Sequence, residues 1–276
     1  MMAGGFYARA EIQQAMDLMV GERLRGRAAQ DILELSTVKN YVIGARMRLD
    51  GRIFRYSYAA GDLAGLARLV INSNYAPGVT GHANEDGFEG GIGFAAAVGA
   101  TYLDIADTAL RAADYYQGGH LIVFGDTIFH QHYIVKSDAG NGTYVRLYLD
   151  KPVAVEAITV AMGCSAYRSP YSAVMAAQST QQEFEPFVGV NLKPVASGNY
   201  FWLQTAGPAF ITPMGVVWPG SAAHLRDVFA WMDGTIQPGT QADPSLGYQR
   251  VGYLLTATGG TAADYGDALI NLQLDQ

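Results

Sequence analysis

The spacing of hydrophobic positions changes once along the chain, near residue 40. Before that point, apolar residues recur every three or four positions and would share one stripe of a helix; they are Ile12, Ala15, Met16, Met19 and Val20. Gly21 and Gly26 each weaken the helix by about 1 kcal/mol relative to Ala. The pattern predicts an N-terminal helical arm over residues 1–40, either as two short helices or as a segment that becomes ordered on a partner.

Beyond residue 40 the periodicity is two, which is typical of β-strands. Asp50-Gly51 and Asn141-Gly142 have the composition of tight two-residue turns. Strands are expected at 41–43, 53–58, 100–105, 120–124, 128–136, 143–149, 153–160, 187–192, 200–206, 209–217, 248–257 and 267–274. This spacing, with no alternating long helices, predicts a mainly β protein with an antiparallel β-barrel or sandwich body, β-tulip-like, over residues 41–276.

One stretch interrupts the strand pattern. Residues 72–93 are rich in Asn, Pro, Gly and acidic side chains, as expected of an exposed excursion or a domain boundary. The body is either one domain or two sub-domains divided near residues 160–190. A chain of 276 residues is long enough for either arrangement.

Composition agrees with packed sheets and many turns. Half of the residues are hydrophobic, only 16% are charged, and the chain has 33 Gly and 17 Tyr. The single cysteine, Cys164, excludes an intramolecular disulfide framework and favours synthesis in a reducing compartment. We find no secretory signal pattern and no apolar run near the roughly 18 residues that span a bilayer. No membrane partner is therefore expected.

Charge is distributed unevenly along the chain. The net charge is −7, yet residues 1–70 carry a net +3 and the remainder −10. A basic leading segment can bind nucleic acid or an acidic protein surface. The charge is spread thinly and few aromatic residues are interleaved with it, so no nucleic-acid partner is expected.

His130 and His132 are the best candidates for a metal site, because side chains two apart on a strand share a face. A zinc site needs a third protein ligand, and His82, Glu85, Asp86 and His120 are the residues that could supply it. No spacing fixes that ligand, and two polar rings on an exposed strand face are the commoner arrangement. No bound metal is expected.

Other reactive patterns fail in context. Gly91-Ile92-Gly93-Phe94-Ala95-Ala96 matches a dinucleotide-binding fingerprint by letters, but a polar loop precedes it in place of a buried strand, so no cofactor is expected. The run 163–167 lacks the closing glycine of a nucleophile elbow, and Cys164 is expected to be a small buried side chain. The acidic pairs at 104 with 107 and 183 with 185 have no fixed geometry. An enzyme is not expected.

Several strand-like segments nevertheless share an order with known proteins. They are Tyr200-Phe201-Trp202-Leu203-Gln204-Thr205-Ala206-Gly207, Arg250-Val251-Gly252-Tyr253-Leu254, the terminal Leu269-Ile270-Asn271-Leu272, and the earlier hairpin Asp50-Gly51-Arg52-Ile53-Phe54-Arg55. By strand order over about residues 46–276, the chain resembles the decoration (cement) proteins that coat the capsids of tailed bacteriophages.

The resemblance implies a structural virion protein, made in the host cytoplasm, that binds the outside of a phage capsid and bridges subunits of the major capsid protein. It also implies a homotrimer. The residues expected to contact the capsid or a neighbouring copy are Phe6, Tyr7, Arg9, Arg23 and Arg25 in the arm and Arg46, Arg48, Arg52 and Arg55 in the hairpin.

Two alternatives remain open at the level of sequence. One is a carbohydrate- or receptor-binding β protein displayed on the virion, whose groove would use aromatic faces; the candidates are Tyr115, Tyr116, Trp202 and Trp218. The other is the major capsid protein itself, which is less favoured because no long uninterrupted helix is expected.

Overall fold

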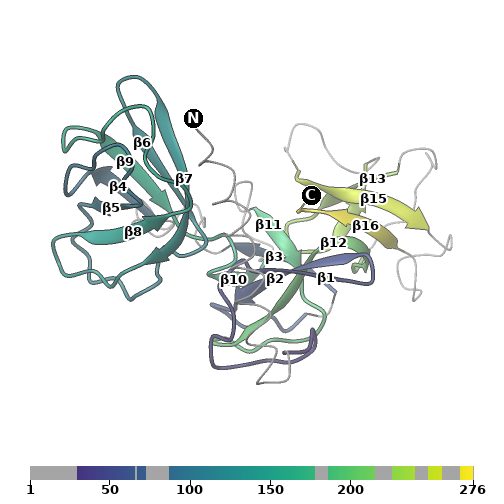
Figure 1. Cartoon of the computed structure of the whole chain (residues 1–276). Coiled ribbons are helices and arrows are strands. Elements are labelled where there is room, and N and C mark those ends of the chain that lie inside the picture. Colours follow the sequence, from purple (N-terminus) through teal and green to yellow (C-terminus); the bar gives the residue numbers. More distant parts are fainter. Residues whose placement is uncertain are drawn as a thin grey trace.

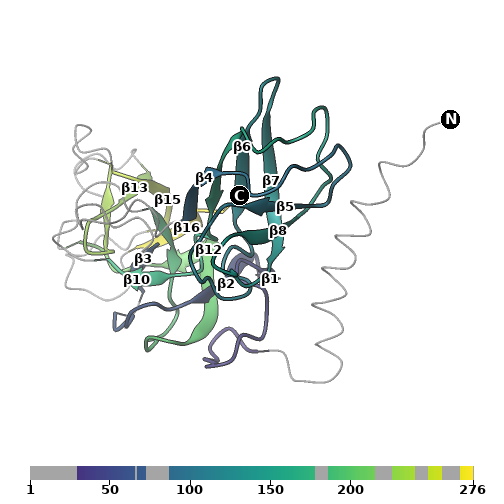
Figure 2. The ribbon, with the colours of Figure 1, turned by 90° about the vertical axis from the view of Figure 1, so that its left-hand side faces the viewer.

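A computed structural model describes residues 30–65, 67–72, 87–177, 186–214, 226–239, 248–256 and 268–275. These residues form two antiparallel curled sheets and no helix (Figure 1). Figure 1 shows the smaller sheet as a separate body beside the larger one, and Figure 2 gives the perpendicular view, in which the two overlap. The mainly β, antiparallel fold expected from the sequence is thus confirmed.

The larger sheet has ten strands drawn from both ends of the described chain. Its order is β10-β3-β11-β12-β16-β15-β13-β14, and β2 pairs with both β1 and β12. The strands are β1 (Arg46–Leu49), β2 (Arg52–Tyr58), β3 (Leu69–Asn72), β10 (Val174–Ala176), β11 (Phe187–Val190), β12 (Tyr200–Phe210), β13 (Asp227–Ala230), β14 (Ile236–Pro238), β15 (Arg250–Thr256) and β16 (Leu269–Gln273).

The smaller sheet is built from one contiguous stretch, residues 87–167, which lies in sequence between β3 and β10 of the larger sheet. Its order is β4-β9-β6-β7-β8-β5. The strands are β4 (Gly87–Gly91), β5 (Tyr102–Ile105), β6 (His120–Phe124), β7 (Phe129–Ser137), β8 (Val145–Leu149) and β9 (Gly163–Tyr167). The chain returns to the larger sheet within the interval 160–190; the predicted division into sub-domains there stays a prediction.

The six-stranded sheet curls until its two edges meet. Ile92, just after β4, forms an antiparallel bridge with Ile105 at the end of β5. The amide of Gly93 donates to the carbonyl of Asp104 at 2.7 Å. The amide of Ala106 donates to the carbonyl of Gly91 at 2.9 Å. The curled sheet encloses an apolar core, and this burial is the main term that stabilises it; its largest fully buried members are Leu103, Ile105, Tyr116, Leu121, Ile134 and Leu147.

The β1–β2 hairpin forms as its turn residues predict. Asp50 has a φ of 50° and Gly51 a φ of 74°, the left-handed pair that a tight turn requires. The second predicted turn differs, because only Gly142 has a positive φ while the Asn141 side chain accepts hydrogen bonds from the amides of Thr143 and Tyr144. Asn141 therefore begins an Asx turn.

Several element predictions were wrong. Residues 41–43 are irregular rather than a strand. Residues 153–160 form a loop that packs on the smaller sheet: Val153 and Ile158 lie in its core, Ile158 bridges Ala96, and Glu156 bonds the β6–β7 turn. The two strands predicted at 200–206 and 209–217 are joined in β12 as far as Phe210. Residues 87–91, expected in a loop, form β4, since glycine allows the close approach to β9: a Cβ at Gly87 would collide with the carbonyl oxygen of Ala166.

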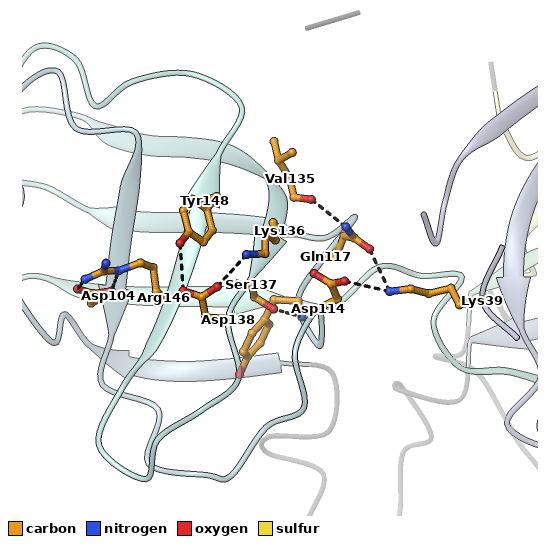
Figure 3. Close-up of polar contacts among 11 residues, drawn as sticks. Lys39, Asp104, Asp114, Gln117, Val135, Lys136, Ser137, Asp138, Arg146 and Tyr148 are labelled. Atoms are coloured by element: carbon orange, nitrogen blue, oxygen red, sulfur yellow. Dashed lines mark hydrogen bonds and ion pairs between the residues drawn. The ribbon is translucent and has the colours of Figure 1, made fainter. Parts of the chain in front are cut away.

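The predicted helical arm is only partly within the described residues. Positions 1–29 lie outside them, and 30–40 form turns with one bridge, from Ser36 to Tyr200 of β12. The part of the arm that can be seen is therefore not helical. Lys39 in this segment links the two sheets: its Nζ lies 3.1 Å from Asp114 Oδ2 and 3.3 Å from Gln117 Oε1, both between β5 and β6 (Figure 3).

Candidate functional site

The four arginines of the β1–β2 hairpin lie on two different faces, because side chains alternate along each strand. Arg46 lies opposite Arg55, and Arg48 lies opposite Ile53, so these residues share one face of the hairpin. Both Arg46 and Arg48 are exposed, whereas Phe54 on the other face is fully buried. The hairpin therefore presents two neighbouring guanidinium groups to solvent on a strand pair whose reverse face buries Phe54.

Arg55 is half-buried and fixed by hydrogen bonds. Its Nη2 lies 2.9 Å from Asp275 Oδ1, its Nε bonds the other oxygen of that carboxylate, and its Nη1 donates to the carbonyl of Gly44. Burial would raise the pKa of Asp275, but the hydrogen bonds and charge of Arg55 hold it below its usual value. This bidentate pair fastens the C-terminal end of the described chain to β2.

Arg52 has an intermediate position next to the turn. Its guanidinium lies 5.3 Å from the ring centroid of Phe54 and 3.8 Å from Asp50 Oδ2. Of the four arginines predicted in the hairpin, the structure thus leaves Arg46 and Arg48 most available to a partner. The predicted arm contacts, Phe6, Tyr7, Arg9, Arg23 and Arg25, lie outside the described residues.

The segment that leads to β1 is anchored by Gln30, a residue that sequence reasoning missed. Gln30 is 5% exposed; its Oε1 accepts from the hydroxyl of Tyr56 at 3.0 Å, and its carbonyl accepts from Trp202 Nε1 at 3.1 Å. Its Nε2 donates to the carbonyls of Glu34 and Tyr200. A polar side chain in an aromatic cluster has no periodic signature, so only the fold reveals it. The first described residue is therefore held in a fixed position by these hydrogen bonds.

An exposed apolar tip lies at the end of the β6–β7 hairpin. Phe124 and Phe129 face each other in register with ring centroids 5.7 Å apart, and they are 45% and 67% exposed. Glu156 fixes the turn between them by accepting hydrogen bonds from the amides of Thr127 and Ile128. Val155, beside Glu156, is also exposed and has a φ of 71°, a strained value for a β-branched residue.

A second exposed apolar group lies on the larger sheet. Phe210 of β12 and Leu269 of β16 face each other in register, and Leu255 of β15 lies on the adjacent strand. All three are at least one-third exposed. Large apolar side chains grouped on one sheet face are characteristic of protein–protein contact surfaces.

The histidine pair occupies a different environment from the one expected. His130 and His132 share a face of β7 as predicted, but that face is the buried one: their exposed fractions are 3% and 5%. The sheet curls around this face, which the alternation of residues could not show. Within the described residues, no group of three or more His, Cys, Asp or Glu side chains is placed to hold a metal ion.

The remaining candidates for chemistry have structural roles. Cys164 is buried on β9, as predicted, and burial raises the pKa of its thiol to about 12. Tyr116 is buried and donates to Asp107 at 2.6 Å, while Trp202 is buried against Gln30. Neither aromatic ring is available to a sugar. Gly91 ends a strand that pairs with β9, so the glycine pattern there does not open a helix.

Comparisons with known proteins add no assignment: no family model, no curated protein and no solved structure matches this chain. Among the described residues, none forms a helix with the length and apolar character needed to cross a membrane. The candidate site is accordingly defined by surfaces: the arginine face of the β1–β2 hairpin and the two exposed apolar groups.

Proposed function

We propose that this chain is a structural virion protein that binds the outside of a bacteriophage capsid and bridges subunits of the major capsid protein. The observation that carries the proposal is the braced hairpin, on which Arg46 and Arg48 are exposed on one face while Phe54 is buried on the other. The resemblance of the strand segments to capsid decoration proteins supplies the partner. In this proposal the two curled sheets are the barrel- or sandwich-like, β-tulip-like body of such a protein.

The proposed mechanism is mechanical stabilisation of the assembled capsid. A protein that binds the assembled shell and not free subunits raises the free energy needed to separate those subunits. Rigid attachment favours this, because a surface that is already ordered loses little conformational entropy on binding. The Arg55–Asp275 pair and the Gln30 cluster provide that rigidity at the hairpin and at the root of the N-terminal segment.

Self-association into a homotrimer is part of the proposal. The exposed Phe210, Leu269 and Leu255 supply an apolar face for a second copy of the chain. Repeated copies around a shell would allow modest individual contacts to accumulate through multivalency. The particle surface is then the site of action and the host cytoplasm the site of synthesis.

Charge reversal in the hairpin tests the proposed contact. We expect Arg46→Glu with Arg48→Glu to weaken co-sedimentation with empty capsids by about tenfold or more, because two favourable charge contacts become repulsive. The matched control is Lys151→Glu with Lys193→Glu, which changes the net charge equally and leaves the hairpin intact. Equal binding by the two double variants would exclude the hairpin as the contact. Capsid-independent binding to a glycan array would favour the carbohydrate-binding alternative.

A further inference from the structure

The interior of the six-stranded sheet contains two stacked imidazole rings. His130 lies opposite Val123, and His132 lies opposite Leu121, both fully buried residues of β6. The ring centroids are 6.2 Å apart and the planes differ by 10°. His130 Nε2 and both ring nitrogens of His132 are buried and lack a hydrogen bond of good geometry; a weak backbone contact of His132 with Lys151 is a minor effect. Such orphaned polar groups are costly in a core, so they call for an explanation.

Each ring has a carboxylate nearby but does not bond it. His130 Nε2 is 3.6 Å from Glu156 Oε1, and His132 Nδ1 is 3.9 Å from Asp150 Oδ1. Both distances exceed those of an N–H···O hydrogen bond. The carboxylates are instead bonded to backbone amides: Glu156 to those of Thr127 and Ile128, and Asp150 to that of Tyr133 at 2.9 Å.

The other ionisable groups around the pair are few. Lys151 follows Asp150; its charge opposes protonation of His132, and its backbone favours protonation by a smaller amount. Asp126 lies in the β6–β7 turn. Cys164 of β9 lies opposite Val123, and burial keeps its thiol neutral. Burial would raise the pKa of Glu156, but the amides of Ile128 and Thr127 hold it low, so this side chain is a carboxylate wherever histidine titrates.

We propose that His130 and His132 form an acid-sensitive switch in the six-stranded sheet. At neutral pH the two rings pack in the core while the two carboxylates cap backbone amides. Proton uptake places like charges side by side in this core and draws Glu156 and Asp150 from the amides toward the rings. The β6–β7 hairpin, with its exposed Phe124 and Phe129, then loosens.

The direction of the pH dependence follows from burial. Burial lowers the pKa of His132, and Asp150 only partly offsets this. A histidine with a lowered folded-state pKa contributes stability that is present above its unfolded value of about 6.5. That stability is lost as the pH falls from there through the folded-state pKa. Loosening is therefore expected on mild acidification.

Hydrogen exchange on the purified protein measures the switch directly. Between about pH 7.5 and about pH 5, the amides of Thr127, Ile128 and Tyr133 should lose protection, after correction for intrinsic exchange rates. We expect the protection factor to fall by about tenfold for each unit by which the pKa of His132 is lowered. Unchanged protection at these three amides would overturn the proposal.

Variants separate this switch from general acid sensitivity. The double variant His130→Leu with His132→Leu should lose the pH dependence of its thermal midpoint over that range, while the control His120→Gln, at an exposed position, should retain it. Equal pH dependence in the double variant and the wild type would contradict the proposal. If the double variant fails to fold, NMR titration of the wild-type protein decides: His132 must titrate below the ordinary histidine value of about 6.5.

Discussion

At the scale of single residues, the sequence showed which positions share a face but not which face is buried. The alternation along β7 places His130 and His132 together, yet only the curling of the sheet, sealed by the Ile92–Ile105 bridge, turns them inward. Cys164 was predictable because an apolar run surrounds it. Gln30 was not, since its partners Tyr56 and Trp202 are distant in sequence.

The Arg55–Asp275 pair gives a prediction at this scale. Asp275→Asn should lower the free energy of unfolding by about 1–3 kcal/mol, because it leaves a half-buried guanidinium without its charged partner. The control is Asp227→Asn in the exposed Arg250 pair, where a loss of at most about 1 kcal/mol is expected. Urea denaturation measures both, and equal losses would show that Arg55 does not brace the hairpin.

The same pair predicts a pH dependence. Because the folded-state pKa of Asp275 is lowered, its contribution to stability is present above the unfolded value of about 3.9. It is lost as the pH falls through the folded-state pKa. In the wild type, unfolding measured at successively lower pH should show this loss, and Asp275→Asn should lack it. A variant with an unchanged acid profile would contradict the assignment.

At the scale of elements, strands with alternating bulky side chains were predictable, whereas strands built from small residues and several strands of only three or four residues were missed; the short ones are β3, β10, β13 and β14. The limits of β6, 120–124, match the expected range, whereas β4 and β9 were missed because their residues are mostly Gly, Ala, Ser and Cys. The loop at 153–160 has apolar residues at strand spacing. Its Glu156, however, accepts hydrogen bonds from the β6–β7 turn. Such partners are non-local and leave no local pattern.

The β4–β9 pairing gives the prediction for this scale. Gly87→Ala should destabilise the smaller sheet by about 1–3 kcal/mol, since the new methyl group would collide with the carbonyl of Ala166. Gly91→Ala on the same strand is the matched control, because a Cβ there meets no atom within 4 Å. Thermal unfolding should rank the variants in that order; equal midpoints would mean that the two strands do not approach closely.

At the scale of the whole molecule, the arrangement of the two sheets could not be predicted. Residues 87–167 form one sheet, and the segments before and after it in sequence join in the other. No periodicity encodes which distant strands pair, and loop-closure cost grows only slowly with length, so such insertions are tolerated. The capsid-binding role likewise depends on surfaces that the sequence suggested only through the arginines and the resemblance.

The central claim is tested most directly by light scattering coupled to size exclusion, on the protein alone and after mixing with empty phage capsids, followed by heating of the particles. We predict a trimer that co-migrates with capsids and raises the temperature at which they break apart, because it binds the assembled shell selectively. A protein that neither co-migrates with capsids nor changes their heat resistance would contradict the proposed function.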